Sequence, residues 1–351
     1  MDHYDEGSGP SLLEKLNGFD KAYESRGVGS DKWRREAREC FDMVAGGGAQ
    51  WDATARAAME EIEANPIEIN GVDPMISAIS GAEVGNRQTV RFSPREQGDV
   101  QVNELLSGAV EYERDECDAS DEESQAFRDA LTCGLGCTET RMDYDLDPQG
   151  QTRVDRTDPL EMAVDPAAKK ANYVDARHCR RERVMACEDA KALFPMLGDD
   201  GDEPEGKSSA HHNNPGQAYS GENGGDNIPP GHRVIKEYQW RELESFTLII
   251  DPMTGQQVQL SAADIKKLEA GGVDVDTLGG VRMRRTKWFR AFRAGDKCVK
   301  EPLPDETFTY KFITGKLDRN RGVPYGVVRA MIDPQRWRNK FLSQIDWIIA
   351  A

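Results

Sequence analysis

The side chains best suited to bind a metal ion are two cysteines and a histidine–cysteine pair. Cys133 and Cys137 are separated by three residues, and His178 directly precedes Cys179. Structural zinc sites usually combine two close ligand pairs, and the C-x₃-C and H-C pairs match that pattern poorly. Cys133 and Cys137 also flank glycines at the end of a predicted helix, where a small apolar residue is sufficient. We therefore predict core cysteines, with no bound metal and no other cofactor.

Motifs of nucleotide binding and hydrolysis are absent from the sequence. Thr314-Gly315-Lys316 lacks the earlier glycine of a phosphate-binding loop, and neither G-x-S-x-G nor H-E-x-x-H occurs. His211 and His212 lie in a low-complexity segment, which argues against a catalytic role. We predict that the chain is not an enzyme. Carboxylates are abundant, however, so a nuclease that uses two metal ions stays open as an alternative.

Charge is distributed unevenly along the chain. The formal net charge is −18, which argues against broad binding to nucleic acid phosphates. Residues 282–300 nevertheless hold eight cations and one carboxylate, whereas residues 111–129 hold nine carboxylates and two cations. A molecule polarised in this way is more typical of a component of an assembly than of a uniform DNA-binding protein.

The basic segment shows an alternation that predicts a strand pair. In such a pair Val281, Met283 and Trp288 would face inward, and the cations would mainly face solvent. Two interpretations stay open, namely a solvated basic face and a surface that docks protein partners. The docking hypothesis names six residues, which are Arg282, Arg284, Arg285, Lys287, Arg290 and Arg293.

Residues 322–351 contain the clearest helix start in the chain. Asp333 can cap the first turn, and Pro334 suits the first helical position. Four apolar residues then share one face, namely Trp337, Phe341, Ile345 and Ile348. The first two turns also hold three cations, which the helix dipole disfavours there, namely Arg336, Arg338 and Lys340. They indicate either an anion nearby or a solvated basic face. Because no stop signal follows, we expect this helix to continue in a longer product.

Composition and periodicity predict an α+β protein with several regions. The segment 198–227 is too poor in apolar residues to fold by itself. A basic helix is predicted around residues 177–193 and a strand over residues 88–92. The predicted regions are a flexible N-terminus (1–30), a helix-rich α+β region (31–197), a low-complexity linker or loop (198–230), a small α/β module (231–320) and the start of a long helix (321–351).

The sequence carries no sign of membrane insertion or secretion. No window approaches about eighteen consecutive apolar residues, and the N-terminus lacks the basic and apolar regions of a secretion signal. Seven cysteines without such a signal indicate reduced thiols in a cytosol. We therefore predict no membrane partner.

A series of short motifs resembles the portal, or head-to-tail connector, proteins of tailed bacteriophages, in particular the type found in short-tailed phages. Each motif is weak alone, but their common order over most of the chain is specific. Ala49, Asn65 and the 198–227 insert depart from the family pattern. The matching residues are Arg35 to Phe41, Gln50-Trp51-Asp52, Asn65-Pro66 with Asn70, Gly81, Asn86-Arg87, Asp129-Ala130, Cys133-Gly134 with Gly136, Asp143-Tyr144, Asp165-Pro166, Asp175-Ala176-Arg177, Phe194-Pro195, Pro304, Thr314-Gly315-Lys316, Tyr325 to Arg329 and Asp333 to Arg336.

The resemblance implies a homo-oligomeric ring, commonly of about twelve subunits, at one capsid vertex of the virion. Such a ring surrounds the channel through which a separate terminase packages double-stranded DNA and through which the DNA is later ejected. Tail adaptor proteins, capsid proteins and scaffold proteins are the other implied partners. Assembly would take place in the cytoplasm of the bacterial host.

On the map of that family, residues 31–197 correspond to the wing, residues 231–320 to the clip and residues 321–351 to the stem helix beside the channel. The basic segment would then meet terminase and tail adaptors, and Arg336, Arg338 and Lys340 would lie near DNA that is not read by sequence. Family members are about twice as long, so we expect a truncated chain. A phage-encoded, metal-dependent DNA-processing nuclease and a structural module of unknown partner are the alternatives.

The interpretation of the cysteines leads to a direct test. Elemental analysis of the purified chain after exhaustive dialysis should find well below one zinc ion per chain, because the four candidate ligands do not form two close pairs of the usual kind. One tightly held zinc ion, lost on the substitution Cys133→Ser or Cys179→Ser, would contradict the prediction.

Overall fold

The structure is a computed structural model of the 351-residue chain, and it describes residues 11–62, 65–94, 100–144, 147–195, 232–250, 256–261, 264–265, 280–303 and 306–350. The predicted low-complexity linker, residues 198–230, lies outside the described residues. None of the helices in the described part of the chain is both long enough and apolar enough to cross a membrane.

Helices dominate the first part of the chain, as predicted. They are α1 (Leu12–Ser25), α2 (Asp31–Ala45), α3 (Ala53–Glu61), α4 (Val72–Val84), α5 (Val100–Glu116) and α6 (Ala119–Thr132). The prediction of a flexible N-terminus over residues 1–30 is wrong for α1. Ser11 and Glu14 form a capping box at its start, and Leu16 and Tyr23 are fully buried against the body.

Antiparallel strands form the rest of the molecule. A three-stranded sheet has the order β2 (Gln151–Thr157), β1 (Leu135–Asp143) and β9 (Tyr310–Thr314). A larger sheet has the order β3 (Met162–Val164), β4 (His178–Ala186), β5 (His232–Ile250), β7 (Val281–Ala294) and β8 (Lys297–Pro302), and β6 (Gln257–Ser261) pairs with the distal part of β5. The smaller elements are η2 (Pro159–Glu161), α7 (Cys187–Leu193), β10 (Lys316–Asp318), β11 (Val323–Tyr325) and η5 (Val328–Ala330), and the chain closes with α9 (Ile332–Ala350). The predicted α+β class is confirmed.

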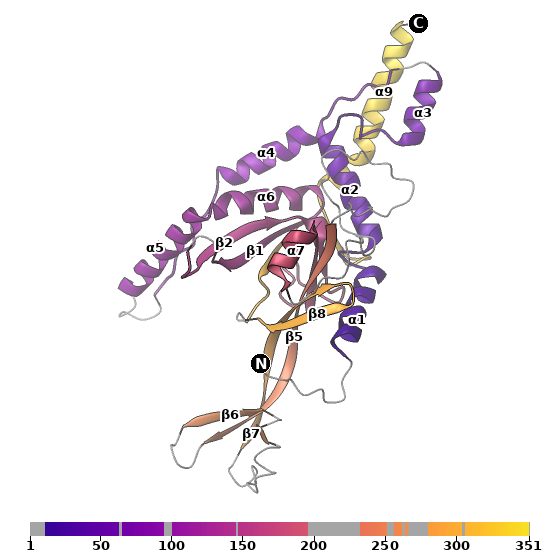
Figure 1. The fold of residues 1–351 in the computed structure, drawn as a ribbon. Coiled ribbons are helices and arrows are strands. Elements are labelled where there is room, and N and C mark those ends of the chain that lie inside the picture. Colours follow the sequence, from indigo (N-terminus) through magenta and orange to yellow (C-terminus); the bar gives the residue numbers. More distant parts are fainter. Residues whose placement is uncertain are drawn as a thin grey trace.

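The molecule is elongated, with three projecting parts (Figure 1). Helix α9 and the neighbouring α3 form the upper end, the arm of α4, α5 and α6 extends to the left, and β6 with the distal end of β7 forms the lower end. The two predicted regions on either side of the linker share one sheet, because β4 pairs with β5 along residues 178–186 and 232–240. Residues 31–197 and 231–320 therefore do not fold as separate bodies.

Residues 178–186 form strand β4, whereas the sequence predicted a basic helix over residues 177–193. Only the last part of that segment is helical, as α7. The apparent helical periodicity arises because β4 is covered on both faces. Arg180 and Glu182 point toward α1. The Arg180 guanidinium donates to Asp20 of α1 at 2.6 Å and to Glu182 of its own strand at 3.1 Å. Arg181 points in the opposite direction, to the other sheet. The predicted strand over residues 88–92 is also wrong, because this exposed segment has no strand partner among the described residues.

The main core lies between the two sheets. Cys133, Cys137 and Cys179 are buried in it together with Leu135 and Tyr310. Burial raises the pKa of all three thiols. In the described part of the chain, no group of three or more His, Cys, Asp or Glu side chains is arranged to hold a metal ion.

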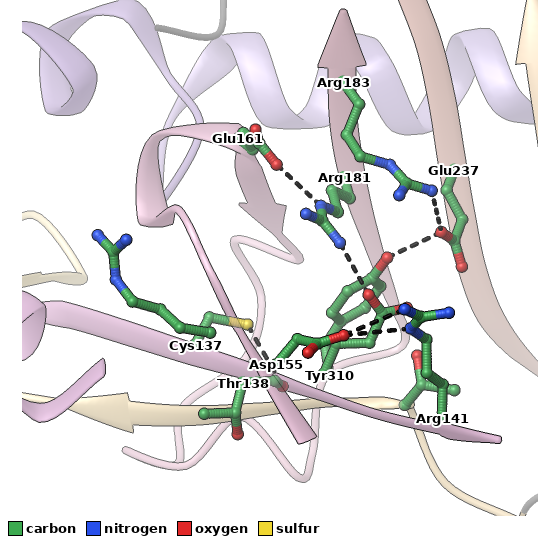
Figure 2. A network of polar contacts seen from close by, with 12 residues as sticks. Cys137, Thr138, Arg141, Asp155, Glu161, Arg181, Arg183, Glu237 and Tyr310 are labelled. Atoms are coloured by element: carbon green, nitrogen blue, oxygen red, sulfur yellow. Dashed lines mark hydrogen bonds and ion pairs between the residues drawn. The ribbon is translucent and has the colours of Figure 1, made fainter. Parts of the chain in front are cut away.

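A buried layer of charged side chains also lies between the sheets (Figure 2). Arg181 of β4 donates to Glu139 of β1 and to Glu161 of η2, each at 2.8 Å. Beside it, the hydroxyl of Tyr310 in β9 donates to Glu237 of β5 at 2.8 Å. These bonds connect strands of both sheets. The cost of burying the charges is offset only while each has its partner.

We expect Arg181→Met to lower the free energy of unfolding by roughly 3–5 kcal/mol, because Glu139 and Glu161 would stay buried without a cation. Arg141→Met is the matched control. Arg141 pairs with Asp155 at 3.2 Å at the exposed end of the same layer, so its loss should cost less than about 1 kcal/mol. Urea unfolding of both variants measures the difference, and equal effects would contradict the role of the buried layer.

The contact of α1 with the sheet should depend on pH through His178. Its ring stacks on Phe19 with centroids 4.2 Å apart, and Nδ1 lies 2.7 Å from the hydroxyl of Tyr23. Burial lowers the pKa of His178 below its usual value, against the opposite effect of Asp165, and the Arg177 charge lowers it further. The folded state therefore favours the neutral imidazole of His178. The stability that this neutral ring contributes is fully present above about pH 6.5, the pKa of an unfolded histidine, and is lost as the pH falls through the lower pKa of His178 in the folded state.

We expect the wild-type chain to lose more stability than His178→Gln between about pH 7.5 and about pH 5.5, by up to roughly 1.4 kcal/mol per pH unit in the window below the unfolded pKa. Urea titrations at the two pH values give the comparison. The glutamine variant serves as the control for all other titrating groups, and an equal loss in both chains would refute the assignment.

Candidate docking surface and terminal helix

The distal half of β7 projects beyond the body of the molecule and is exposed on both faces (Figure 1). The sequence predicted that Val281 and Met283 face inward, but they are 59% and 45% exposed. The prediction is wrong because, among the described residues, no second layer covers this part of the sheet. Trp288, closer to the body, is half-buried and packs edge-on against Phe308, with centroids 4.7 Å apart.

Most of the predicted docking cations are paired with carboxylates of their own chain. Arg285 and Lys287 both bind Glu244 of β5, at 2.9 and 2.8 Å. Partial burial alone would raise the pKa of Glu244, but the bonds from these two cations hold it below its usual value. Arg290 pairs with Glu301 of β8 at 3.0 Å.

Arg293 belongs to the same paired group. It donates to Asn17 of α1 at 2.7 Å and lies 3.6 Å from Asp20. Its role is therefore to attach α1 to the sheet. Of the six predicted cations, four are already engaged within the chain.

Arg282 and Arg284 differ from these four. Both are exposed, and neither has an ion pair among the described residues. They lie on the same face of the sheet as Leu243, because Leu243 is opposite Thr286 and Ser245 is opposite Arg284. Leu243 is 74% exposed. We call Leu243, Arg282 and Arg284 the distal surface, which combines free positive charge with an exposed apolar side chain. Val281 and Met283 alternate with the two arginines and therefore point to the opposite face of the sheet.

Helix α9 is attached to the body by polar side chains and not by its apolar face. Gln335, Asn339 and Ser343 recur every four residues and are all buried. Ser343 accepts a hydrogen bond from the backbone N–H of Ile67 at 2.8 Å, and Asn339 accepts one from that of Ile69 at 3.3 Å. We call these three side chains the polar seam of α9. Their hydrogen bonds satisfy the backbone N–H groups of Ile67 and Ile69 in the extended segment 65–70.

Gln50 is the centre of the same attachment. It is fully buried, and its side-chain carbonyl accepts hydrogen bonds from Gln335 and Asn339, both at 2.9 Å. Its own amide group donates to the carbonyl of Met43 at 2.8 Å, which connects α9 to the end of α2. Sequence reasoning singled out Gln50-Trp51-Asp52 only as a family motif and missed this role. The i, i+4, i+8 spacing of Gln335, Asn339 and Ser343 was the available signal.

The predicted apolar face of α9 exists, but it is exposed. Trp337, Phe341, Ile345 and Ile348 are 51–67% exposed, on the side of the helix opposite the polar seam. They form a continuous stripe, and the rings of Trp337 and Phe341 lie 5.5 Å apart.

The three cations of α9 have different environments. Arg336 pairs with Glu39 of α2 at 2.8 Å and so helps to attach the helix. Arg338 and Lys340 are exposed and have no ion pair among the described residues. Their predicted proximity to DNA stays a prediction.

Comparison with known proteins identifies the family. The family model of the phage P22-like portal protein matches residues 17–351, which is nearly the whole chain. No curated protein matches the sequence. The resemblance predicted from the ordered motifs is confirmed, and the mixed α and β architecture agrees with it. The chain belongs to the P22-like portal protein family of bacteriophages.

Proposed function

We propose that the chain is one subunit of a ring-shaped channel at a single vertex of the phage capsid. DNA would enter the capsid through this channel during packaging and leave through it at ejection. The observation that carries the proposal is the family match over residues 17–351. Portal proteins are structural components, and we assign the chain no enzymatic activity and no cofactor.

The charge distribution supports a conduit for DNA. The net charge is −18, and four of the six predicted docking cations are paired with carboxylates of the same chain. A surface with many free cations would bind phosphates and release their counterions, which favours tight and salt-dependent attachment. An acidic body with few free cations instead lets the duplex slide.

The projecting parts of the molecule suggest a division of roles. In this proposal the arm of α4, α5 and α6 belongs to the wing, the strands that end in the distal surface form the clip-like part, and α9 is the stem helix. The subunit would form a ring with copies of itself, of about twelve members, and would contact capsid and scaffold proteins within the virion. It would be assembled in the host cytoplasm.

The distal surface is the proposed contact for terminase and then for tail adaptors. Its free cations, Arg282 and Arg284, can steer a partner during encounter without making the complex too stable to exchange. The exposed side chain of Leu243, on the same face of the sheet, supplies the apolar contact. Arg285, Lys287, Arg290 and Arg293 support this surface from within the sheet and do not meet the partner directly.

Rings seen by negative-stain imaging, together with no metal-dependent cleavage of plasmid DNA, are the expected results for the protein expressed from its intact gene. Arg282→Glu with Arg284→Glu should leave the rings unchanged, because neither side chain has an ion pair in the part of the chain that the structure describes. In a phage that depends on the variant for its portal, packaging or tail attachment should fall at least about tenfold.

Lys169→Glu with Lys170→Glu is the matched control, since it makes the same change of charge at two other exposed cations. The control should package and attach tails normally. Normal packaging and tailing by the Arg282 and Arg284 variant would remove the docking role, and DNA cleavage without rings would favour the nuclease alternative.

A further inference from the structure

Strand β7 has a free edge at the lower end of the molecule (Figure 1). One side of the strand pairs with β5 over residues 281–293, whereas β8 covers the other side only over residues 289–294. Just beyond β8, the N–H of Leu303 still donates to the C=O of Trp288 at 3.0 Å. In the described part of the chain, no strand pairs with the outer side of residues 281–287. We call this side the free edge of β7, and an edge of this kind can accept another extended strand.

The bond to Trp288 shows which backbone groups point outward at the free edge. In an antiparallel ladder the N–H and C=O of one residue point to the same side, and the side alternates along the strand. The register of β7 with β5 continues without interruption. Because the C=O of Trp288 points away from β5, the N–H and C=O groups of Arg282, Arg284 and Thr286 also do so. These residues therefore offer donors and acceptors to a further strand.

The side chains of the free edge restrict what can pair with it. Arg282 and Arg284 are exposed on one face and have no ion pair among the described residues. Opposite charges on facing strands stabilise a pair, and like charges directly opposite destabilise it. Two copies of this edge paired antiparallel about Met283 would place Arg282 of one copy opposite Arg284 of the other. The charge therefore favours a strand that carries carboxylates at two positions, separated by one residue.

Strand β6 of a second copy is a weaker match for the same edge. Its residues Gln257–Ser261 carry no charge, so they would leave both arginines without a partner. The observed charge thus points to an acidic segment of another protein as the occupant.

A hollow of about 550 Å³ opens where β8 ends, directly beside the free edge. The apolar part of its lining consists of Trp288, Phe289, Pro302 and Leu303. A strand that continues the line of β8 along β7 would begin at this hollow. Pockets of this size and character hold large apolar groups, so the first side chain of such a strand can be anchored there.

We infer that the free edge of β7 binds an extended, acidic segment of a partner protein by strand addition. The segment runs antiparallel to β7, as β5 and β8 do. Its large apolar anchor lies opposite Lys287 and enters the hollow beside Phe289, which is on the same face of the sheet. Its two carboxylates follow opposite Arg284 and Arg282.

The inference rests on the proposed docking role of the distal surface and specifies how the partner is held. Backbone hydrogen bonds to the free edge supply affinity, and the alternate side chains supply specificity. The residue between the two carboxylates faces the same side as Met283, which is 45% exposed, so an apolar side chain is expected there. The segment thus has a defined order, namely an apolar anchor, then an acidic, an apolar and an acidic residue.

Fluorescence anisotropy of a labelled peptide on the purified chain tests the inference. The probe is a peptide of about nine residues in which phenylalanine is followed, after two glycines, by aspartate, valine and aspartate. A control peptide carries lysine in place of both aspartates. The probe should bind at least about tenfold more tightly than the control, because only its charges complement Arg282 and Arg284.

Methylation of the peptide backbone separates strand addition from simple charge attraction. The N–H groups of the two aspartates would donate to the free edge, so N-methylation of both should weaken binding at least about tenfold. The N–H of the intervening valine would point away from β7, and its methylation should change the affinity by less than about threefold. This comparison needs no change in the protein.

Thr286→Pro and Thr286→Val test the same bonds from the protein side. Proline removes the outward N–H and is tolerated where an edge N–H faces solvent, whereas valine keeps the N–H and a similar shape. The proline variant should bind the probe about tenfold more weakly, and the valine variant should match the wild type within about threefold. Urea unfolding of both variants verifies that the fold is kept.

Three results would overturn the inference. One is equal binding of the probe and the lysine control, and another is an equal loss from methylation at aspartate and at valine. The third is an absence of probe binding together with rings that fail to form in Thr286→Pro, which would show that a second copy covers the edge. If no probe binds but phage with Arg282→Glu and Arg284→Glu fail in packaging or tail attachment, strand addition is wrong and the proposed docking role stands.

Discussion

The buried ion layer between the two sheets is the interaction on which the rest of the structure depends. Arg181 donates hydrogen bonds to the carboxylates of Glu139 and Glu161, which belong to two different elements. Tyr310 donates a hydrogen bond to the carboxylate of Glu237 across the same interface. A buried charge without its partner costs more than the pair contributes, so the sheets can meet in only one register. That register also determines where the arm, the distal surface and α9 project from the body.

Strand β4 shows how this constraint extends to the other face of the larger sheet. Arg180, next to Arg181, points in the opposite direction and binds Asp20 of α1. Arg293 and Tyr238 reach the same carboxylate, Tyr238 at 2.8 Å. Helix α1 is therefore attached by a second ionic cluster, and two consecutive arginines connect three layers of the molecule. The ionic cluster acts together with an apolar cluster in which Leu16 of α1 packs against Tyr238 and Trp240 of β5.

Helix α9 extends the same principle to the surface. Its polar seam of Gln335, Asn339 and Ser343 binds to backbone groups of segment 65–70, which frees its apolar stripe for other contacts. Helix α5 has a corresponding arrangement, with Arg114 toward α6 and its apolar face toward solvent. Exposed apolar patches of this kind are typical of proteins that assemble. The interior combines an apolar core with buried polar pairs, and the apolar faces of α5 and α9 are exposed.

The sequence by itself determined the α+β class, the helical first part, the strand pair of the basic segment and, through ordered motifs, the family. These features depend on local periodicity, on turn residues and on motif order, all of which are visible along the chain. Local patterns also located the cations at 282–293 and the apolar repeat at 337–348 correctly.

Only the tertiary structure decided which of these side chains are free. Arg285, Lys287 and Arg290 are paired because β5 and β8 bring Glu244 and Glu301 beside them, and this pairing joins residues far apart in sequence. The same holds for β4, whose two buried faces mimic a helical pattern, and for α9, whose attachment by its polar face reverses the usual assumption about an amphipathic helix. Pairing across elements depends on long-range geometry, and a one-dimensional pattern carries no information about which partner a charge or an apolar stripe will meet.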